Sequence, residues 1–155
     1  MYLLFFTSNT INEGQIILIM NIDNLTLQNK DGDQIDLDLT RAIVYFYPKA
    51  DTPGCTTEAK AFTDHLDEFT KHGFTIYGIS PDSVDDICNF SDKYDLQHVL
   101  LADPDKEAAK AFNSIKQGRI QRRTFIICDG IVIQKWDHKP GQTEEQVLEA
   151  VKDLQ

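Results

Sequence analysis

One cysteine, Cys55, stands where the sequence could support nucleophilic chemistry. It follows Thr52-Pro53-Gly54, between an apolar run over 42–47 and a segment whose apolar residues recur at helical spacing. Proline is favoured at the first position of a helix and threonine just before it, so we expect Cys55 at the third helical position. There the thiolate would lie among unpaired backbone N–H groups at the positive end of the helix dipole, an environment that lowers the pKa of a thiol.

A lowered pKa alone would not make this thiol a fast enzyme nucleophile. A reference thiol is about 3% ionised at neutral pH, and lowering its pKa to about 6 would raise that fraction about thirty-fold. The accompanying loss of nucleophilicity would offset roughly ten-fold of the gain. Donors must therefore stabilise charge on the departing group, and the candidates are the Thr52 hydroxyl, first-turn N–H groups and an arginine. Because Cys55 shares a helix face with Ala59 and Phe62, we expect it partly shielded at the floor of a small pocket.

The remaining cysteines and the histidines carry weaker signals. Cys88 and Cys128 complete an odd count of three without a CxxC pair, which argues against a disulfide scaffold, a zinc ribbon and a thioredoxin dithiol. The histidines share no metal-ligand spacing, and we expect them to be ordinary surface or hydrogen-bonded side chains: His65, His72, His98 and His138. The sequence has no glycine-rich phosphate loop and no Ser/Cys–His triad signature. It therefore predicts neither a metal nor a cofactor.

Alternating strands and helices must position the candidate site. Strands are expected over 25–28, 34–37, 42–47, 74–80, 99–102, 124–128 and 131–136. Helices are expected over 53–72, from a cap at Asp82 or Ser83 to Tyr94, over 105–112, and after a cap at Thr143. Strand–helix–strand units give parallel pairs, whereas the hairpin at Asp129-Gly130 adds an antiparallel edge. This order predicts an α/β, thioredoxin-like three-layer sandwich with a central mixed β-sheet and an N-terminal β-hairpin. A flavodoxin-like sheet is the alternative, and the late hairpin fits it poorly.

Length and charge limit the domain organisation and the partners. With 155 residues, 41% of them hydrophobic, the chain can form one domain with its own core. We assign residues 21–155 to this domain and 1–20 to an N-terminal extension; one hypothesis is that Met20 is the natural start. The short apolar runs of the extension fit neither a transmembrane helix nor a signal peptide, so no membrane partner is expected. A net charge of −10 argues against nucleic acid as a partner, and the cysteine usage favours a reducing, cytoplasmic location.

Residues 48–55 resemble the PxxxTxxC motif of the peroxiredoxins. The wider run over 45–59 is similar to the Q-type, or bacterioferritin-comigratory-protein, branch of that family, and later segments agree with it: 78–83, 101–105 and 122–127. This resemblance implies a thiol peroxidase that reduces hydrogen peroxide and small organic hydroperoxides. Cys55 would attack the O–O bond and become a sulfenic acid, Thr52 would hydrogen-bond the peroxide, and Pro48 would shield the site.

The same resemblance implies an arginine partner for the thiolate. In families of this kind the arginine lies three residues before a strand phenylalanine, which places it at Arg122, given Phe125. Arg123 is the competing choice, but alternation along a strand should send the two side chains to opposite faces. Glu58 is a weaker candidate that would hold the arginine; it is as readily explained as an acidic residue near a helix N-terminus.

The route that recycles the sulfenic acid stays open in the sequence. Many Q-type members have a second cysteine five residues after the first, and that position is Lys60 here. Cys88 is the remaining helical candidate for a resolving cysteine, although the corresponding position in some relatives falls nearer Ser91. If Cys88 does not act, the enzyme uses one cysteine and an external thiol reduces it. We expect Cys128 to be structural.

Two kinds of function use the same cysteine. The resemblance implies a monomeric enzyme recycled by thioredoxin or a similar thiol reductant. The alternative is a thioredoxin-like redox-sensing module that passes oxidation from Cys55 to a partner protein without catalytic turnover. A third hypothesis, a disulfide reductase, is disfavoured because the chain has no CxxC pair.

Overall fold

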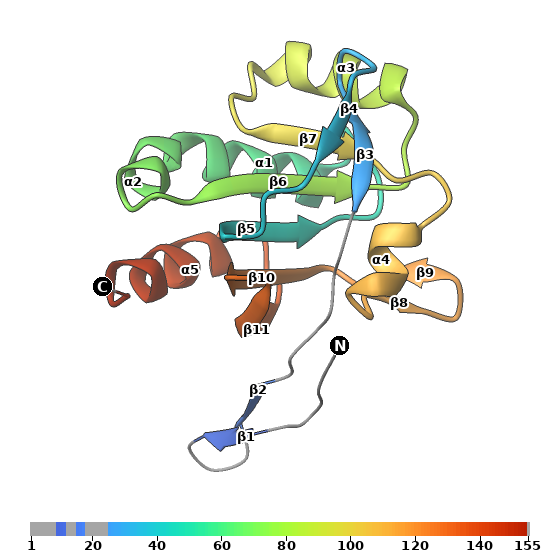
Figure 1. The fold of residues 1–155 in the computed structure, drawn as a ribbon. Coiled ribbons are helices and arrows are strands. Elements are labelled where there is room, and N and C mark those ends of the chain that lie inside the picture. The colour runs from blue at the N-terminus through green and yellow to red at the C-terminus, as the bar shows by residue number, and fades with distance from the viewer. Residues whose placement is uncertain (1–8, 12–14, 18–24, 155) are drawn as a thin grey trace.

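A computed structural model of the chain describes residues 9–11, 15–17 and 25–154 (Figure 1). The predicted extension over 1–20 and the suggested start at Met20 lie largely outside these residues. Two short strands are described there, β1 (Asn9–Ile11) and β2 (Gln15–Ile17), which pair antiparallel. The division of the chain at residue 20 therefore stays a prediction.

A seven-stranded mixed sheet forms the centre of the domain, in the order β11-β10-β5-β6-β7-β3-β4. Its central strands β5, β6 and β7 run parallel, and β10 and β3 join them antiparallel on either side. The strand bounds are β3 (Thr26–Asn29), β4 (Gln34–Asp36), β5 (Arg41–Phe46), β6 (Thr75–Ser80), β7 (Val99–Ala102), β10 (Arg123–Cys128) and β11 (Ile131–Asp137). The prediction of a central mixed sheet with an early β-hairpin, β3–β4, is confirmed.

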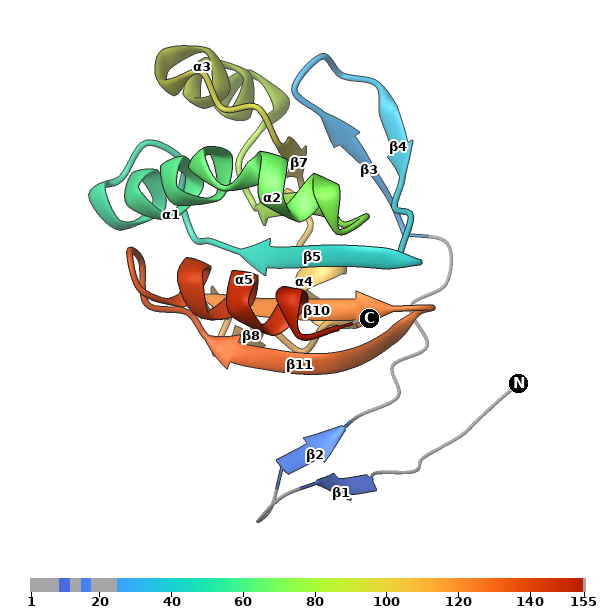
Figure 2. The same cartoon turned by 90° about the vertical axis from the view of Figure 1, so that its left-hand side faces the viewer.

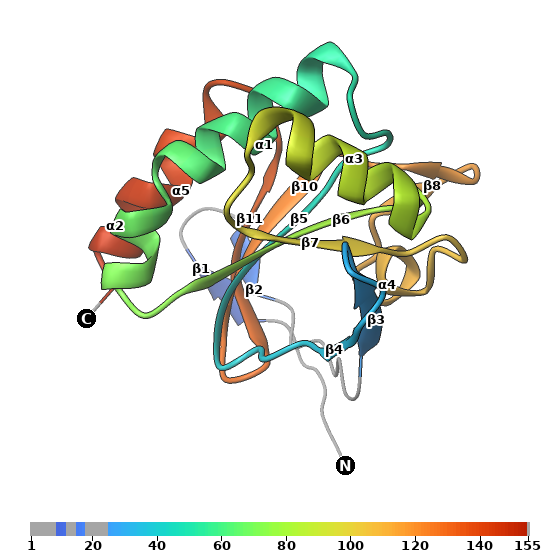
Figure 3. The same ribbon diagram turned by 90° about the horizontal axis from the view of Figure 1, so that it is seen from above.

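Helices cover both faces of this sheet, which makes three layers. One face carries α1 (Pro53–Asp64), α2 (Leu66–Lys71), α3 (Val84–Tyr94) and α5 (Thr143–Lys152), and the other carries α4 (Glu107–Ala111) (Figure 3). Figure 2 shows α5 lying across β10 and β11, next to α1 and α2. Successive side chains of β5 pack into two hydrophobic cores on opposite faces of the sheet. Tyr45 belongs to the core under α1, α2, α3 and α5, and Phe46 belongs to the core under α4. Among the described residues, no helix is both long and apolar enough to cross a membrane.

Both predicted hairpin turns are present. In the β3–β4 turn, the Asn29 side chain accepts hydrogen bonds from the backbone N–H groups of Asp31 and Asp33. In the β10–β11 turn, Asp129 and Gly130 have φ values of 52° and 77°, the left-handed conformation that a two-residue type I′ turn requires.

Two local predictions are wrong, and one short hairpin was missed. The helix expected over 53–72 is divided into α1 and α2, because the backbone at His65 leaves helical geometry (φ −100°, ψ 8°). Thr143 does not cap α5; it is the first helical residue, and its hydroxyl accepts a hydrogen bond from the Lys139 N–H instead.

The short hairpin of β8 (Ile115–Lys116) and β9 (Arg119–Ile120) was not predicted, since two-residue strands leave almost no periodic pattern. Of the two caps proposed for α3, the structure uses Ser83.

Candidate active site

Cys55 lies in the first turn of α1, at the position that the sequence predicts. Pro53 opens the helix and Thr52 is the residue before it, with extended backbone (φ −102°, ψ 158°). This places Cys55 third in the helix, where the backbone N–H groups have no partners within the helix. The side chain is more enclosed than expected: it is 0% exposed and packs among the core residues Ala59 and Phe62.

The loop that leads to Cys55 is held by neighbours distant in the sequence. The Ala50 N–H donates to the Asp82 carboxylate at 2.7 Å. Asp51 adopts a left-handed conformation (φ 60°), uncommon for a residue other than glycine, and its carboxylate accepts hydrogen bonds from Lys93 and Tyr94 of α3. The loop geometry is therefore fixed by α3 and by the residues that follow β6. Sequence analysis considered Asp82 only as a helix cap and missed this contact.

Arg122 reaches the sulfur of Cys55. Its Nη2 donates to Cys55 Sγ at 3.2 Å, and its Nη1 donates to Glu58 Oε1 at 2.9 Å. The guanidinium thus bridges the Cys55 sulfur and a carboxylate one turn later on α1. The guanidinium lies directly beside Gly54, where a Cβ would come within 3.4 Å of Nη2, about van der Waals contact. Arg123 turns away and pairs with Asp137, as alternation along the strand predicts.

Glu58 continues into a buried cluster of ionisable side chains. His138 Nε2 lies 3.0 Å from Glu58 Oε2 and 2.7 Å from Glu144 Oε2. On its other edge, His138 Nδ1 forms a hydrogen bond with the Thr124 hydroxyl. All these side chains are almost completely inaccessible to solvent. Sequence analysis missed the cluster: it treated His138 as one ordinary histidine among four and did not consider Glu144, because no local spacing connects the three residues.

The cluster perturbs the titration of its members. Burial raises the pKa of Glu58, and the nearby His138 and Arg122 only partly oppose that effect. Burial disfavours the charged form of His138, but its hydrogen bonds to Glu144 and Glu58 outweigh this, so that the pKa of His138 is raised. The raised pKa of His138 fits an imidazolium beside two carboxyl groups, whereas the raised pKa of Glu58 shows that burial favours its neutral form and that its charge depends on His138 and Arg122.

The same cluster offers several possible ligand atoms for a metal ion. Glu58, His138 and Glu144 each offer one ligand atom, and these atoms lie within 4.8 Å of one another. Tetrahedral zinc with ligands at about 2.0–2.2 Å would hold the ligand atoms roughly 3.3 Å apart. The 2.7 Å separation of His138 Nε2 from Glu144 is instead that of a hydrogen bond, which the one proton on Nε2 supplies, and Glu58 Oε2 lies 3.0 Å from the same nitrogen as an ion-pair partner. The residues therefore fit a proton better than a metal ion.

Thr52 and Pro48 belong to the loop that leads to Cys55. Thr52 is partly exposed, and its hydroxyl donates to the Lys49 carbonyl at 2.8 Å, which leaves its oxygen lone pairs able to accept. The Thr52 side chain makes no capping hydrogen bond to α1. Pro48 is exposed at the start of the loop. The roles assigned to both residues stay predictions.

Cys88 and Cys128 lie away from this arrangement. Cys88 is on α3 and donates weakly to Asp92, which pairs in turn with Lys30 of the β3–β4 turn. Partial burial, together with the charge of Asp92, raises the pKa of the Cys88 thiol. Cys128 ends β10 beside the hairpin turn and is half-buried. All three cysteines are present as free thiols.

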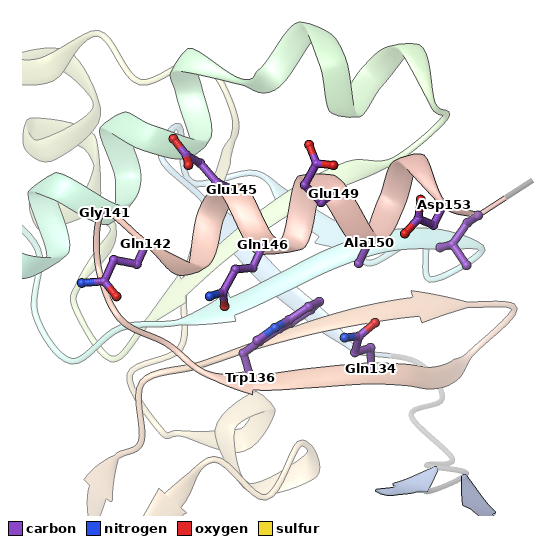
Figure 4. Close-up of a pocket in the computed structure, with 10 residues that line it drawn as sticks. Gln134, Trp136, Gly141, Gln142, Glu145, Gln146, Glu149, Ala150 and Asp153 are labelled. Atoms are coloured by element: carbon purple, nitrogen blue, oxygen red, sulfur yellow. The ribbon is translucent and has the colours of Figure 1, made fainter. Parts of the chain in front are cut away.

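A separate open pocket of about 880 Å³ lies between β11 and α5. Figure 4 shows Trp136 and Gln134 on the strand side, facing Gln146 and Ala150 on the helix. The acidic residues Glu145, Glu149 and Asp153 also line it. None of the candidate site residues contributes to this pocket, so it is distinct from the surroundings of Cys55.

Comparison with known proteins identifies the family of the chain. The model of the AhpC/TSA family matches residues 21–135. The Bacillus subtilis peroxiredoxin Bcp is 34% identical over 143 residues, which span 84% of this chain and 90% of that protein. A Mycobacterium tuberculosis relative is 40% identical over 102 residues, which span 64% of this chain and only 65% of its own length. A structure of the Xanthomonas campestris bacterioferritin comigratory protein, studied for alkyl peroxide reduction, has a TM-score of 0.78 at 38% identity and covers 83% of this chain and 90% of that chain.

The fold and the first-turn cysteine beside an arginine define a class: thioredoxin-like proteins with a reactive thiol. The chain belongs to the AhpC/TSA family and, within it, to the peroxiredoxins of the bacterioferritin-comigratory-protein, or Q, branch. The thioredoxin-like fold and the family resemblance predicted from the sequence are therefore confirmed.

Proposed function

We propose that this chain is a thiol-dependent peroxidase and that Cys55 is its peroxidatic cysteine. The observation that carries the proposal is the Arg122 guanidinium, 3.2 Å from the sulfur of a cysteine in the first turn of a helix. In the reaction, the Cys55 thiolate attacks one peroxide oxygen, an S–O bond forms, and the O–O bond breaks. The departing oxygen leaves with the electron pair and takes up a proton, so that water or an alcohol is released and Cys55 becomes a sulfenic acid.

The neighbouring groups act on the two peroxide oxygens. Arg122 stabilises the thiolate before attack and the negative charge on the departing oxygen during it. The Thr52 oxygen accepts a hydrogen bond from the peroxide O–H, because its own hydrogen is directed to Lys49. The sulfur is fully buried whereas the Arg122 side chain is 24% exposed, so the peroxide approaches along the guanidinium. Hydrogen peroxide and small organic hydroperoxides fit such a narrow approach, and Pro48 shields it from the solvent side.

We further propose that an external thiol, such as thioredoxin, reduces the sulfenic acid. Cys88 lies on the face of α3 that carries Asp92 and turns toward Lys30, whereas the loop before Cys55 contacts Lys93 and Tyr94 on another face. A disulfide requires Cα atoms about 4.4–6.8 Å apart, which would demand local unfolding here. The raised pKa of Cys88 also disfavours attack by its thiolate at neutral pH. These observations support a one-cysteine route.

Steady-state turnover tests the proposed activity. Wild-type protein and a Cys128→Ser control should consume hydrogen peroxide continuously in the presence of thioredoxin, thioredoxin reductase and NADPH, whereas Cys55→Ser should show no turnover. Turnover by Cys55→Ser would overturn the assignment. A single stoichiometric oxidation of wild-type protein without turnover would favour the redox-sensing module over the enzyme.

Peptide mapping after one equivalent of peroxide tests the recycling route. The one-cysteine route predicts a persistent sulfenic acid on Cys55, trapped by dimedone, and unchanged turnover in Cys88→Ser. A Cys55–Cys88 crosslink together with loss of turnover in Cys88→Ser would refute it.

The odd cysteine count without a CxxC pair is typical of a reducing compartment, and we propose that the enzyme acts in the cytoplasm as a monomer. Sedimentation of the reduced and oxidised protein tests the oligomeric state, and a stable dimer would contradict the monomer.

A further inference from the structure

A row of alternating acidic and basic side chains leads from the protein interior to the Cys55 sulfur. From the inside outward it consists of Glu144, His138, Glu58, Arg122 and Cys55, and neighbouring polar atoms are 2.7, 3.0, 2.9 and 3.2 Å apart. Glu58, His138 and Glu144 have side chains that are 0–1% exposed. In such surroundings each charge depends on its neighbours, because little solvent is available to stabilise a charged group alone.

The backbone couples the same residues. The His138 N–H donates to the Arg122 carbonyl at 2.8 Å, so the segment after β11 is fixed to the residue that carries the guanidinium. The imidazole is held at both edges, by the Thr124 hydroxyl and by the two carboxylates. His138 therefore has little freedom to turn away from Glu58.

We propose that His138 and Glu144 are positioning residues for the peroxidase reaction, which hold Glu58 as a carboxylate against Arg122 and thereby keep the guanidinium at Cys55. This inference rests on the proposed function. Neither residue touches the sulfur; both act through Glu58. Glu144 keeps the proton on His138, and the resulting imidazolium keeps Glu58 ionised despite its burial.

In the part of the chain that the structure describes, the elements packed around His138 supply no second titratable group that contacts both Glu58 and Glu144. Among the described residues, α1 contributes Glu58 and the Phe62 ring, α5 contributes Glu144, and β10 contributes Thr124. The Tyr45 ring of β5 also packs nearby, but its hydroxyl bonds to His98 and its pKa is raised well above the ordinary value, mainly by burial. If His138 lost its proton, the two buried carboxylates would face each other without a cation between them, and Glu58 would keep Arg122, on its Oε1 side, as its remaining positive partner. Glu58 would then take up a proton more readily and hold Arg122 less firmly.

Glu144→Gln tests this inference, with Glu145→Gln as the matched control. Both variants remove one negative charge from adjacent positions of α5, but Glu145 is exposed. Without Glu144, His138 should lose its proton within the neutral pH range. We therefore measure the ratio of the peroxide rate constant of Glu144→Gln to that of wild type, and we expect this ratio to fall with rising pH. Near pH 8 the variant should be about ten-fold slower, because the loss of one charge-assisted hydrogen bond changes a rate by about this factor.

Alkylation of Cys55 by iodoacetamide separates positioning from general damage. That reaction does not use the guanidinium to stabilise a departing oxygen, so it should fall by a much smaller factor than the peroxide reaction in Glu144→Gln. Glu145→Gln should match wild type in both reactions. Equal peroxide rates for Glu144→Gln and Glu145→Gln at every pH, or equal losses in both reactions of Glu144→Gln, would overturn the inference.

A measurement on the wild-type protein covers the case in which Glu144→Gln does not fold. In ¹⁵N-histidine NMR, His138 should keep both ring nitrogens protonated at pH values at which an ordinary histidine, with a pKa near 6.5, has already become neutral. A neutral His138 at pH 6.5 would refute the inference even if the protein is a peroxidase. Conversely, absence of peroxide turnover in both wild type and Glu145→Gln would refute the proposed function. The NMR measurement of the His138 charge does not depend on turnover, so the two failures can be told apart.

Discussion

Replacement of Arg122 should separate thiol ionisation from stabilisation of the departing oxygen. In Arg122→Ala, Cys55 loses a charge-assisted hydrogen bond at 3.2 Å, worth about 1.5–3 kcal/mol or about ten- to a hundred-fold in the ionised fraction. The remaining thiolate is intrinsically more nucleophilic, with a Brønsted slope of about 0.4–0.5, so alkylation by iodoacetamide should fall only about three- to ten-fold. Peroxide reduction also loses the donor that faces the departing oxygen, which costs a further factor of about 10²–10³.

Two rate constants measured on the same samples test this reasoning. Peptide-resolved mass spectrometry follows the oxidation of Cys55 by hydrogen peroxide and its alkylation by iodoacetamide at one pH. Arg123→Ala is the matched control, because Arg123 is the next residue and pairs with Asp137 away from the sulfur. Arg122→Lys keeps a charge near Glu58 but loses the planar fork, so it should alkylate almost normally and reduce peroxide slowly. If both reactions of Arg122→Ala fall by the same factor, Arg122 acts only through ionisation and the proposed transition-state role is wrong.

Two further predictions concern the core behind the site. Gly78→Ala should lower the free energy of unfolding in urea by about 1–3 kcal/mol, because its Cβ would lie 2.6 Å from the buried Tyr45 ring; no loss relative to Thr75→Ala, an exposed position on β6, would refute the packing argument. Burial lowers the pKa of His98 from 6.5 to about 3. Between these values the unfolded chain binds a proton at His98 that the folded chain does not, so stability falls as the pH decreases, by about 1.4 kcal/mol per pH unit. His98→Gln should flatten this acid limb, and parallel pH profiles would contradict the account.

Local sequence determined the position of Cys55 and most of the elements around it. Pro53 and Thr52 fix where α1 begins, and the start of the helix places the cysteine in the first turn. The apolar run of β5 and the turn at Asp129-Gly130 likewise act over a few neighbouring residues. The choice of Arg122 needed the family resemblance as well, since no short-range preference connects residue 122 with residue 55. Alternation of side chains along the strand then correctly predicted that Arg122, and not Arg123, faces Cys55.

Tertiary structure alone decided what lies behind Arg122. Glu58, His138 and Glu144 come from α1, the segment after β11 and the start of α5, and only the sheet order brings these elements together. Each residue taken singly has an ordinary local explanation. Propensity and spacing act between near neighbours, whereas the charge of a buried group depends on partners supplied by distant parts of the chain. For the same reason the sequence could place Cys88 on a helix, but only the packing of α3 showed that it turns toward Lys30 rather than toward Cys55.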